Sequence, residues 1–186
     1  EKREKEAKIA EEKRISSNLG FRDLKPGLHQ SKIQKMRICN IPLSNKSGTI
    51  CYGIDNLKFL GTFYQDYLTK LTIDLGPIVG SVGLIDELAT YIQKGETNIY
   101  LKMRAALGGK YKMDFEFSER DRQLFNEKVK DNFYTVYHGG QVALPINRGK
   151  RGYSRDLWLY LVYRDVKPAQ RFLKSTKPKR EKKGDF

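Results

Sequence analysis

Residues 138–166 read HGGQVALPINRGKRGYSRDLWLYLVYRDV, and this stretch decides the fold of the chain. Its last part, residues 157–163, is apolar on both faces of an extended chain, which predicts a strand in the centre of a sheet or one covered by a helix. Residues 147–155 before it are basic and contain glycines, which predicts a loop. A cationic loop held against a rigid strand presents charge to a polyanionic surface. The stretch therefore favours binding over catalysis.

Further strands are predicted by the alternation of apolar and polar side chains. One face of a strand at residues 67–75 is expected to carry Tyr67, Thr69, Leu71, Ile73 and Leu75. In the same way, residues 113–117 are expected to place Met113, Phe115 and Phe117 on one face. Residues 133–137 are β-branched and aromatic enough for another strand. Shorter strands are expected at residues 35–41 and 57–63.

Two helices are predicted from N-cap residues followed by apolar residues at helical spacing. The first begins at Ser81 and ends at Gly95, with an apolar face of Leu84, Ile85, Leu88, Tyr91 and Ile92. The second begins at Ser118, has Asp121 in its first turn and turns Leu124, Phe125 and Val129 inward. Because half-exposed strands precede and follow both helices, we expect an α+β fold, with a mixed, mainly antiparallel sheet packed by two or more helices.

A single domain is expected, because 186 residues of which 39% are hydrophobic can form one core. We expect it to span residues 31–166, between a charged N-terminal arm and linker at residues 1–30 and a basic tail at residues 167–186, with both ends flexible. No apolar run approaches the ~20 residues that cross a bilayer. Neither the number nor the spacing of Cys39 and Cys51 makes a disulfide scaffold or a zinc site, so both are expected to be free thiols.

The N-terminal arm mixes lysine, arginine and glutamate around few apolar residues, which predicts a helix with only a thin apolar stripe. So short a helix is marginal without packing, and a solvated or frayed arm is one interpretation. The other interpretation is an arm that docks on a neighbouring copy of the protein through Ile15 and Phe21.

The formal net charge of +14 predicts a partner that is nucleic acid, an anionic membrane or an acidic protein surface. The side chains expected to make this contact are Arg148, Lys150, Arg151 and Arg155, and an ordinary solvated turn is the alternative. At about 1 kcal/mol per basic residue near an anionic leaflet, four such residues give about millimolar affinity. One copy would bind weakly, so a protein that works through this loop is expected to self-associate.

The C-terminal tail is similar to a monopartite nuclear-import signal, with the cations Lys177, Lys179, Arg180, Lys182 and Lys183. Plain solubilising charge is the alternative interpretation. Neither histidine, His29 or His138, has serine, cysteine or acidic neighbours in a pattern that builds a catalytic triad or a metal site. We therefore expect no enzyme activity, no cofactor and no metal.

With these residues in view, the chain resembles the matrix proteins of rhabdoviruses, and the plant-infecting, nucleus-replicating members look closest. The resemblance is concentrated in residues 140–166, with a weaker similarity from the strand at 67–75 through the helix at 84–92 to residues 101–108. It implies a mixed fold with an antiparallel sheet, packed helices and a flexible N-terminal arm. The chain departs from many animal-virus members by lacking proline-rich budding motifs near its start, which puts recruitment of host budding machinery in doubt.

The resemblance implies a viral matrix protein that self-associates and bridges the helical nucleocapsid to the inner face of the envelope during virion assembly. The implied partners are further copies of the chain, the viral nucleoprotein and nucleocapsid, and an anionic membrane. The envelope glycoprotein tail, importin and RNA are further candidates. The implied location is the virion, beneath the envelope, and the host nucleus and cytoplasm in membrane-associated form.

The leading alternative is a nucleic-acid-binding or capsid protein whose basic loop and aromatic residues bind single-stranded nucleic acid. The residues that keep this alternative open are Tyr153, Arg155, Trp158 and Tyr160. Aromatic residues of this kind are more often part of a core or a sheet surface. A host ribonucleoprotein component with basic tails is a third interpretation.

Overall fold

The computed structural model describes residues 4–6, 19–36, 48–52, 57–79, 99–127, 131–148 and 157–176. Its strands are β1 (Gly48–Tyr52), β2 (Lys58–Tyr64), β3 (Tyr67–Val79), β4 (Met113–Phe115), β5 (Asn132–Tyr137), β6 (Val142–Arg148) and β7 (Leu157–Arg164). Its helices are α2 (Gln30–Lys35), α4 (Ile99–Gly108), α5 (Glu119–Asn126) and α6 (Val166–Thr176), with a 3-10 turn η2 (His138–Gly140). These elements form one α+β domain, as predicted.

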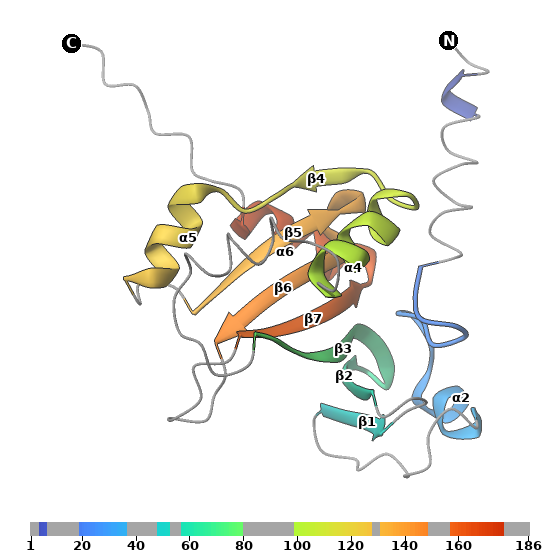
Figure 1. Ribbon diagram of the computed structural model, residues 1–186. Helices are drawn as coiled ribbons and strands as arrows, with labels where there is room; N and C mark the ends of the chain where they lie inside the picture. The colour runs from blue at the N-terminus through green and yellow to red at the C-terminus, as the bar shows by residue number, and fades with distance from the viewer. Residues whose placement is uncertain are drawn as a thin grey trace.

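The strands of the described residues form a single antiparallel sheet in the order β1-β2-β3-β7-β6-β5-β4. Helix α4 lies in front of this sheet and α6 lies behind it in Figure 1. We call the two sides the α4 face and the α6 face. Both faces are apolar at the centre of the sheet, so each helix covers part of a hydrophobic core.

Strand β7 occupies the centre of the sheet, as its doubly apolar sequence predicts. It pairs with β3 on one side and β6 on the other. Leu159 and Leu161 belong to the large core cluster on the α4 face, whereas Val162 belongs to a smaller cluster on the α6 face. A strand buried on both sides in this way needs apolar residues at successive positions.

Strand β3 departs from the predicted alternation at its start. Leu68 and Leu71 are both fully buried, although an unbroken alternation would place them on opposite faces. The cause is a bulge: Thr62 pairs with Lys70 and Phe63 pairs with Leu68, so Thr69 has no partner of its own in β2. One extra residue shifts the alternation, so the side chains before the bulge lie on the opposite face of the sheet from the one that an unbroken pattern predicts. The predicted inward position of Tyr67 is therefore wrong, and this side chain is 51% exposed.

A similar irregularity changes the facing of β4. Met113 and Phe117 pack against the large cluster on the α4 face, but Phe115 packs against the small cluster on the α6 face. The register shifts between Met113 and Phe115 where β4 pairs with β5. The prediction that all three side chains share a face is wrong for Phe115.

The folded domain begins before residue 31, the predicted boundary. Leu19, Leu24 and Ile33 are buried in the large cluster, so residues 19–30 are not a linker. Their backbone also joins the sheet, because Gly27 N donates to Leu68 O at 2.7 Å and Leu68 N donates to Leu28 O at 2.8 Å. These bonds complete β3 beyond the end of β7 and fix the N-terminal segment to the core.

The domain also extends past residue 166, because α6 belongs to it. Ala169 is fully buried, and Phe172 and Leu173 pack on the small cluster of Val136, Ala143 and Val162. Residues 167–176 of the predicted tail are thus a helix of the fold. The rest of the predicted tail, residues 177–186, lies beyond the described part of the chain.

The predicted helix at Ser118 is confirmed as α5. Asp121 N donates to Ser118 Oγ at 3.2 Å, and Ser118 N donates to Asp121 Oδ2 at 2.9 Å. This reciprocal pair satisfies two amides that the first turn leaves open. The strand predicted at residues 35–41 is wrong at Lys35, which ends α2. The helix predicted from Ser81 to Gly95 lies outside the described residues.

Candidate functional site

The basic stretch that the sequence singles out connects the two central strands β6 and β7. Arg148 pairs with Leu157 at the loop end of this hairpin, where residues 149–156 connect the two strands in sequence. Arg148 is half-buried, and its amide donates to Asp131 O at 3.1 Å. Of the four cations predicted to contact a polyanion, the structure places Arg148. The other three, Lys150, Arg151 and Arg155, lie outside the described residues.

Helix α6 adds positive charge that the sequence reasoning assigned to a tail. Lys167, Arg171 and Lys174 are exposed on its outer side, and Ala169 and Phe172 pack inward. The amphipathic spacing of these residues could have revealed the helix. The predicted nuclear-import cations, Lys177, Lys179, Arg180, Lys182 and Lys183, follow directly in the sequence and lie outside the described residues.

Two further cations meet on the α6 face of the sheet. Lys70 and Arg164 are directly paired across β3 and β7. The Arg164 side chain is only 8% exposed, and its Cζ lies 3.7 Å from the ring centroid of Phe172. Burial lowers the pKa of Arg164 to about 10 and also lowers the pKa of Lys70, with Arg164 itself as a second cause. This face of the molecule is therefore cationic from β3 to α6.

The aromatic residues of the nucleic-acid alternative are only partly placed. Trp158 and Tyr160 are half-buried on β7, and Tyr160 packs against the small cluster on the α6 face. Burial raises the pKa of Tyr160, with the charge of Asp74 as a second cause. Tyr153 and Arg155 lie outside the described residues.

The proposed self-association residue Phe21 is partly buried and packs against the large cluster of its own chain. Its ring is 5.4 Å from that of Phe59, and its backbone forms an antiparallel bridge with Leu24. The side chain thus closes the large cluster from the N-terminal side and is not an anchor held out by an arm. Its partner in the prediction, Ile15, lies outside the described residues.

The two histidines have structural contacts. His29 caps α2, because its Nδ1 accepts a hydrogen bond from Ser31 N at 3.2 Å, and its ring lies 5.0 Å from that of Tyr67. The His138 ring lies 5.9 Å from that of Tyr111. In the described part of the chain no group of three or more His, Cys, Asp or Glu residues is placed to hold a metal ion.

A partly buried polar network connects α4, the residue after β4, and β5. Tyr100 donates a hydrogen bond from its hydroxyl to Glu116 Oε1 at 2.9 Å and shares another with Thr135 Oγ1 at 2.9 Å. Arg104 Nη2 donates to Glu116 Oε2 at 2.7 Å. Burial raises the pKa of Tyr100, and the charge of Glu116 adds to this effect. The network holds α4 against the sheet without exposing an assembled acid, base and nucleophile.

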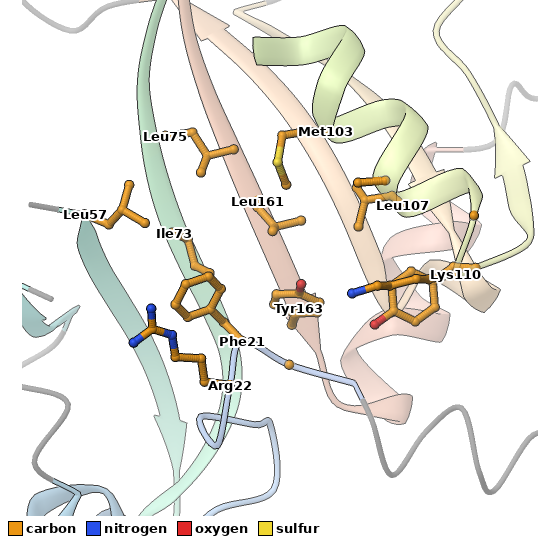
Figure 2. A pocket seen from close by; sticks show the side chains of 14 residues that line it. Phe21, Arg22, Leu57, Ile73, Leu75, Met103, Leu107, Lys110, Leu161 and Tyr163 are labelled. Atoms are coloured by element: carbon orange, nitrogen blue, oxygen red, sulfur yellow. The ribbon is translucent and has the colours of Figure 1, made fainter. Parts of the chain in front are cut away.

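An apolar pocket of about 810 Å³ lies on the α4 face (Figure 2). It is formed by α4 and the turn after it, by β3 and β7, by Leu57 just before β2, and by the N-terminal segment around Phe21. Its apolar walls include Leu57, Ile73, Leu75, Met103, Ala106, Leu107 and Leu161, and its polar groups include Arg22, Lys110, Tyr111 and Tyr163. Sequence reasoning missed this pocket, because its residues come from segments far apart in the chain.

Comparison with protein-family models, with curated proteins and with solved structures found no match for this chain. No helix within the described ranges is long and apolar enough to cross a membrane.

Proposed function

We propose that this protein is a viral matrix protein that self-associates and bridges a helical nucleocapsid to the inner face of the envelope. One observation carries the proposal: the pairing of Arg148 with Leu157 attaches a segment with three more cations to the two central strands of the sheet. A rigid support of this kind lets a basic segment meet a polyanionic surface while the body stays folded. The cationic α6 face, with the basic tail after it, supplies a second charged surface.

Self-association follows from the strength of such contacts. Each cation near an anionic leaflet contributes about 1 kcal/mol, so a few of them bind only at about millimolar concentration. Many copies on one surface bind far more tightly, because each bound copy raises the effective concentration of the next. The partners in this proposal are the protein itself, the viral nucleoprotein and nucleocapsid, and an anionic membrane. The glycoprotein tail, importin and RNA are further partners, and the role is not enzymatic.

The proposed locations are the virion, beneath the envelope, and the host nucleus and cytoplasm in membrane-associated form. Support for the nuclear part comes from the run of lysines and arginine in residues 177–183. In the sequence this segment directly follows α6, which ends at Thr176.

Membrane contact is tested by reversing the charge of Lys150, Arg151 and Arg155 to glutamate and measuring cosedimentation with phosphatidylserine-containing vesicles. Arg148 is left unchanged, because it is half-buried at the end of β6. We expect the affinity to fall at least about hundredfold, since three contacts of about 1 kcal/mol are lost.

The matched control reverses Lys32, Lys102 and Lys112, which are exposed elsewhere on the protein and change the net charge equally. Equal loss in both variants would show that only net charge matters, and the assignment to the hairpin would fail.

The nucleic-acid alternative keeps one structural support, the exposed cations Lys167, Arg171 and Lys174 of α6. It predicts that the isolated monomer binds single-stranded RNA with an affinity that falls steeply on a log-log plot against salt. The matrix proposal predicts instead that electron microscopy at moderate salt shows ordered filaments or sheets. A chain that stays monomeric at high concentration and on acidic vesicles would contradict the matrix role.

A further inference from the structure

The pocket on the α4 face has apolar walls that the fold leaves partly open. Leu57 just before β2, Leu75 of β3 and Met103 of α4 are incompletely buried and face the cavity (Figure 2). Ile73 and Leu161 form its floor and are buried in the sheet. A volume of about 810 Å³ is within the range of ~300–1,000 Å³ that small-molecule sites occupy.

One end of this pocket is polar. Tyr163 lies on its floor, and Figure 2 shows the Lys110 side chain pointing into the pocket toward it. Tyr111 lies beside Lys110 after the end of α4. Tyrosine hydroxyls are protonated donors at neutral pH, and burial raises the pKa of both groups further. An ammonium group and two phenols form a donor-rich end next to an apolar channel.

The charged side chains that line the pocket in the described part of the chain are all positive. Among the described residues that line it, Arg22 and Lys110 are cations and none is acidic. An anionic head group would therefore be attracted to the polar end, and it would receive charge-assisted hydrogen bonds there. A neutral or cationic head group would gain less or be repelled.

We propose that this pocket binds a free fatty acid, with its acyl chain between Leu57, Leu75 and Met103 and its carboxylate beside Lys110, Tyr111 and Tyr163. The apolar walls supply the affinity for the chain, and the donors at one end select the anionic head. This site uses none of the cations of the β6–β7 hairpin. It goes beyond the proposed function and can fail or succeed independently of vesicle binding.

The competing occupant is the chain itself. Residues 80–98 connect the end of β3 at Val79 with the start of α4 at Ile99, and both of these elements line the pocket. The sequence of this segment contains the apolar residues Leu84, Ile85 and Leu88. The segment also carries Asp86 and Glu87 next to these residues, so the cations of the pocket match either occupant in charge. Filling by residues 80–98 is an outcome that the experiment detects as absence of binding.

The test titrates the full chain, without vesicles, with the fluorescent fatty acid cis-parinaric acid below its micelle concentration. Saturated fatty acids of increasing length and their matched primary alcohols then displace the probe. We expect saturable binding of one probe per chain, with affinity rising about fourfold per added methylene until the pocket is filled. The alcohols should bind at least about tenfold more weakly, because they do not pair with Lys110.

Two variants locate the site. Ala106→Trp fills the pocket from an exposed position of α4 and should weaken binding at least tenfold, while circular dichroism checks that the fold is kept. Lys110→Glu should abolish the preference for acid over alcohol. The matched control Lys102→Glu makes the same charge change at an exposed position of α4 outside the pocket and should bind like the wild type.

Three outcomes would overturn the proposal: no saturable binding, equal binding of acids and alcohols, or binding unaffected by Ala106→Trp. The first would show that residues 80–98 or another segment fill the pocket. The last would place the ligand elsewhere on the protein. None of these results depends on whether the hairpin binds vesicles, so failure of this proposal is separate from failure of the matrix role.

Discussion

Gly140 packs so closely on Ala169 that a Cβ atom added to Gly140 would lie 2.5 Å from the carbonyl oxygen of Ala169. The same Cβ would lie 3.0 Å from the Cβ of Leu173, so two turns of α6 touch this one position. Gly140 also has a positive φ of 84°, and its amide donates to Asp114 Oδ2 at 3.1 Å. Gly140 is therefore a docking point for α6, the helix that precedes the basic tail.

We predict that Gly140→Ala detaches or displaces α6. A Cβ here adds overpacking of about 1–3 kcal/mol to the cost of about 1–2 kcal/mol for a left-handed residue. Urea unfolding should show this loss of stability, and hydrogen exchange should show reduced protection of residues 166–176.

The matched control for this prediction is Gly139→Ala. Gly139 also has a positive φ, of 62°, but a Cβ there meets nothing within 4 Å. Gly139→Ala should lower the stability only by the ~1–2 kcal/mol that a non-glycine residue with positive φ costs, and it should leave the hydrogen-exchange protection of α6 unchanged. Equal effects of the two variants would show that the contact with Ala169 does not hold α6.

The hydroxyls of Tyr100 and Tyr137 are predicted to have opposite effects on stability. Tyr100 bonds to Glu116 and Thr135, so Tyr100→Phe leaves two polar groups short of a partner and should cost about 1–3 kcal/mol. The Tyr137 hydroxyl is buried and has no hydrogen-bond partner in the described part of the chain. Tyr137→Phe removes a desolvated group without breaking a bond, so it should be neutral or stabilising. Chemical denaturation of both variants at pH 8 measures the difference, and a large loss in Tyr137→Phe would contradict the prediction.

Alkaline pH should destabilise the fold through the same buried phenols. Burial raises the pKa of Tyr137 from 10.0 to about 12, since the interior disfavours the phenolate, and the pKa of Tyr100 and Tyr163 rises for the same main reason. The folded state therefore holds these protons more tightly than the unfolded state. Their stabilising contribution is complete below pH 10 and is lost as the pH rises from 10 to about 12.

Arg164 opposes this trend, because its lowered pKa of about 10 increases stability as the pH rises above that value. Arg164 is present in both the wild type and Tyr137→Phe, so its contribution drops out of the difference between their free energies of unfolding. We expect the free energy of unfolding of Tyr137→Phe to fall less steeply between pH 10 and about 11.5 than that of the wild type. Parallel curves for the two proteins would show that Tyr137 does not titrate with a raised pKa.

The sequence predicts those parts of this fold whose cause is local. The apolar run of β7 and the reciprocal bonding of Ser118 and Asp121 depend on neighbouring residues, and both appear as expected. The facing of Leu68 and Phe115 depends on bulges, which arise where one strand is fitted to another. Periodicity within a single strand contains no information about such a shift.

The candidate sites are harder to predict for a related reason. Arg148 can be picked out from the basic stretch in which it lies. The fatty-acid pocket cannot, because its residues come from separate segments, as Phe21, Leu57, Met103 and Leu161 show. Residues 19–29 read as a linker because their leucines are spaced by turn residues and show no period. They belong to the core because their backbone bonds to β3, which only the tertiary structure shows.

The contact between Arg164 and Phe172 makes a prediction about charge burial. The guanidinium stacks on the ring at 3.7 Å, but Nη1 is buried without a hydrogen-bond partner in the described residues, and Lys70 is the cross-strand neighbour. A desolvated cation beside a second cation is costly, and an apolar side chain of similar volume often fits such a place at least as well. We therefore expect Arg164→Met to raise the thermal midpoint.

Arg164→Lys is the matched control, because it keeps the charge while it removes the planar group that stacks on Phe172. It should lower the midpoint below that of the wild type. In a double-mutant cycle, Lys70→Met should stabilise the wild type more than it stabilises Arg164→Met, since the repulsion between the two cations is already absent in the latter. A lower midpoint for Arg164→Met than for Arg164→Lys would contradict the prediction. It would show that the position against the Phe172 ring requires a cation, and that the contact with the ring outweighs the cost of burying that cation.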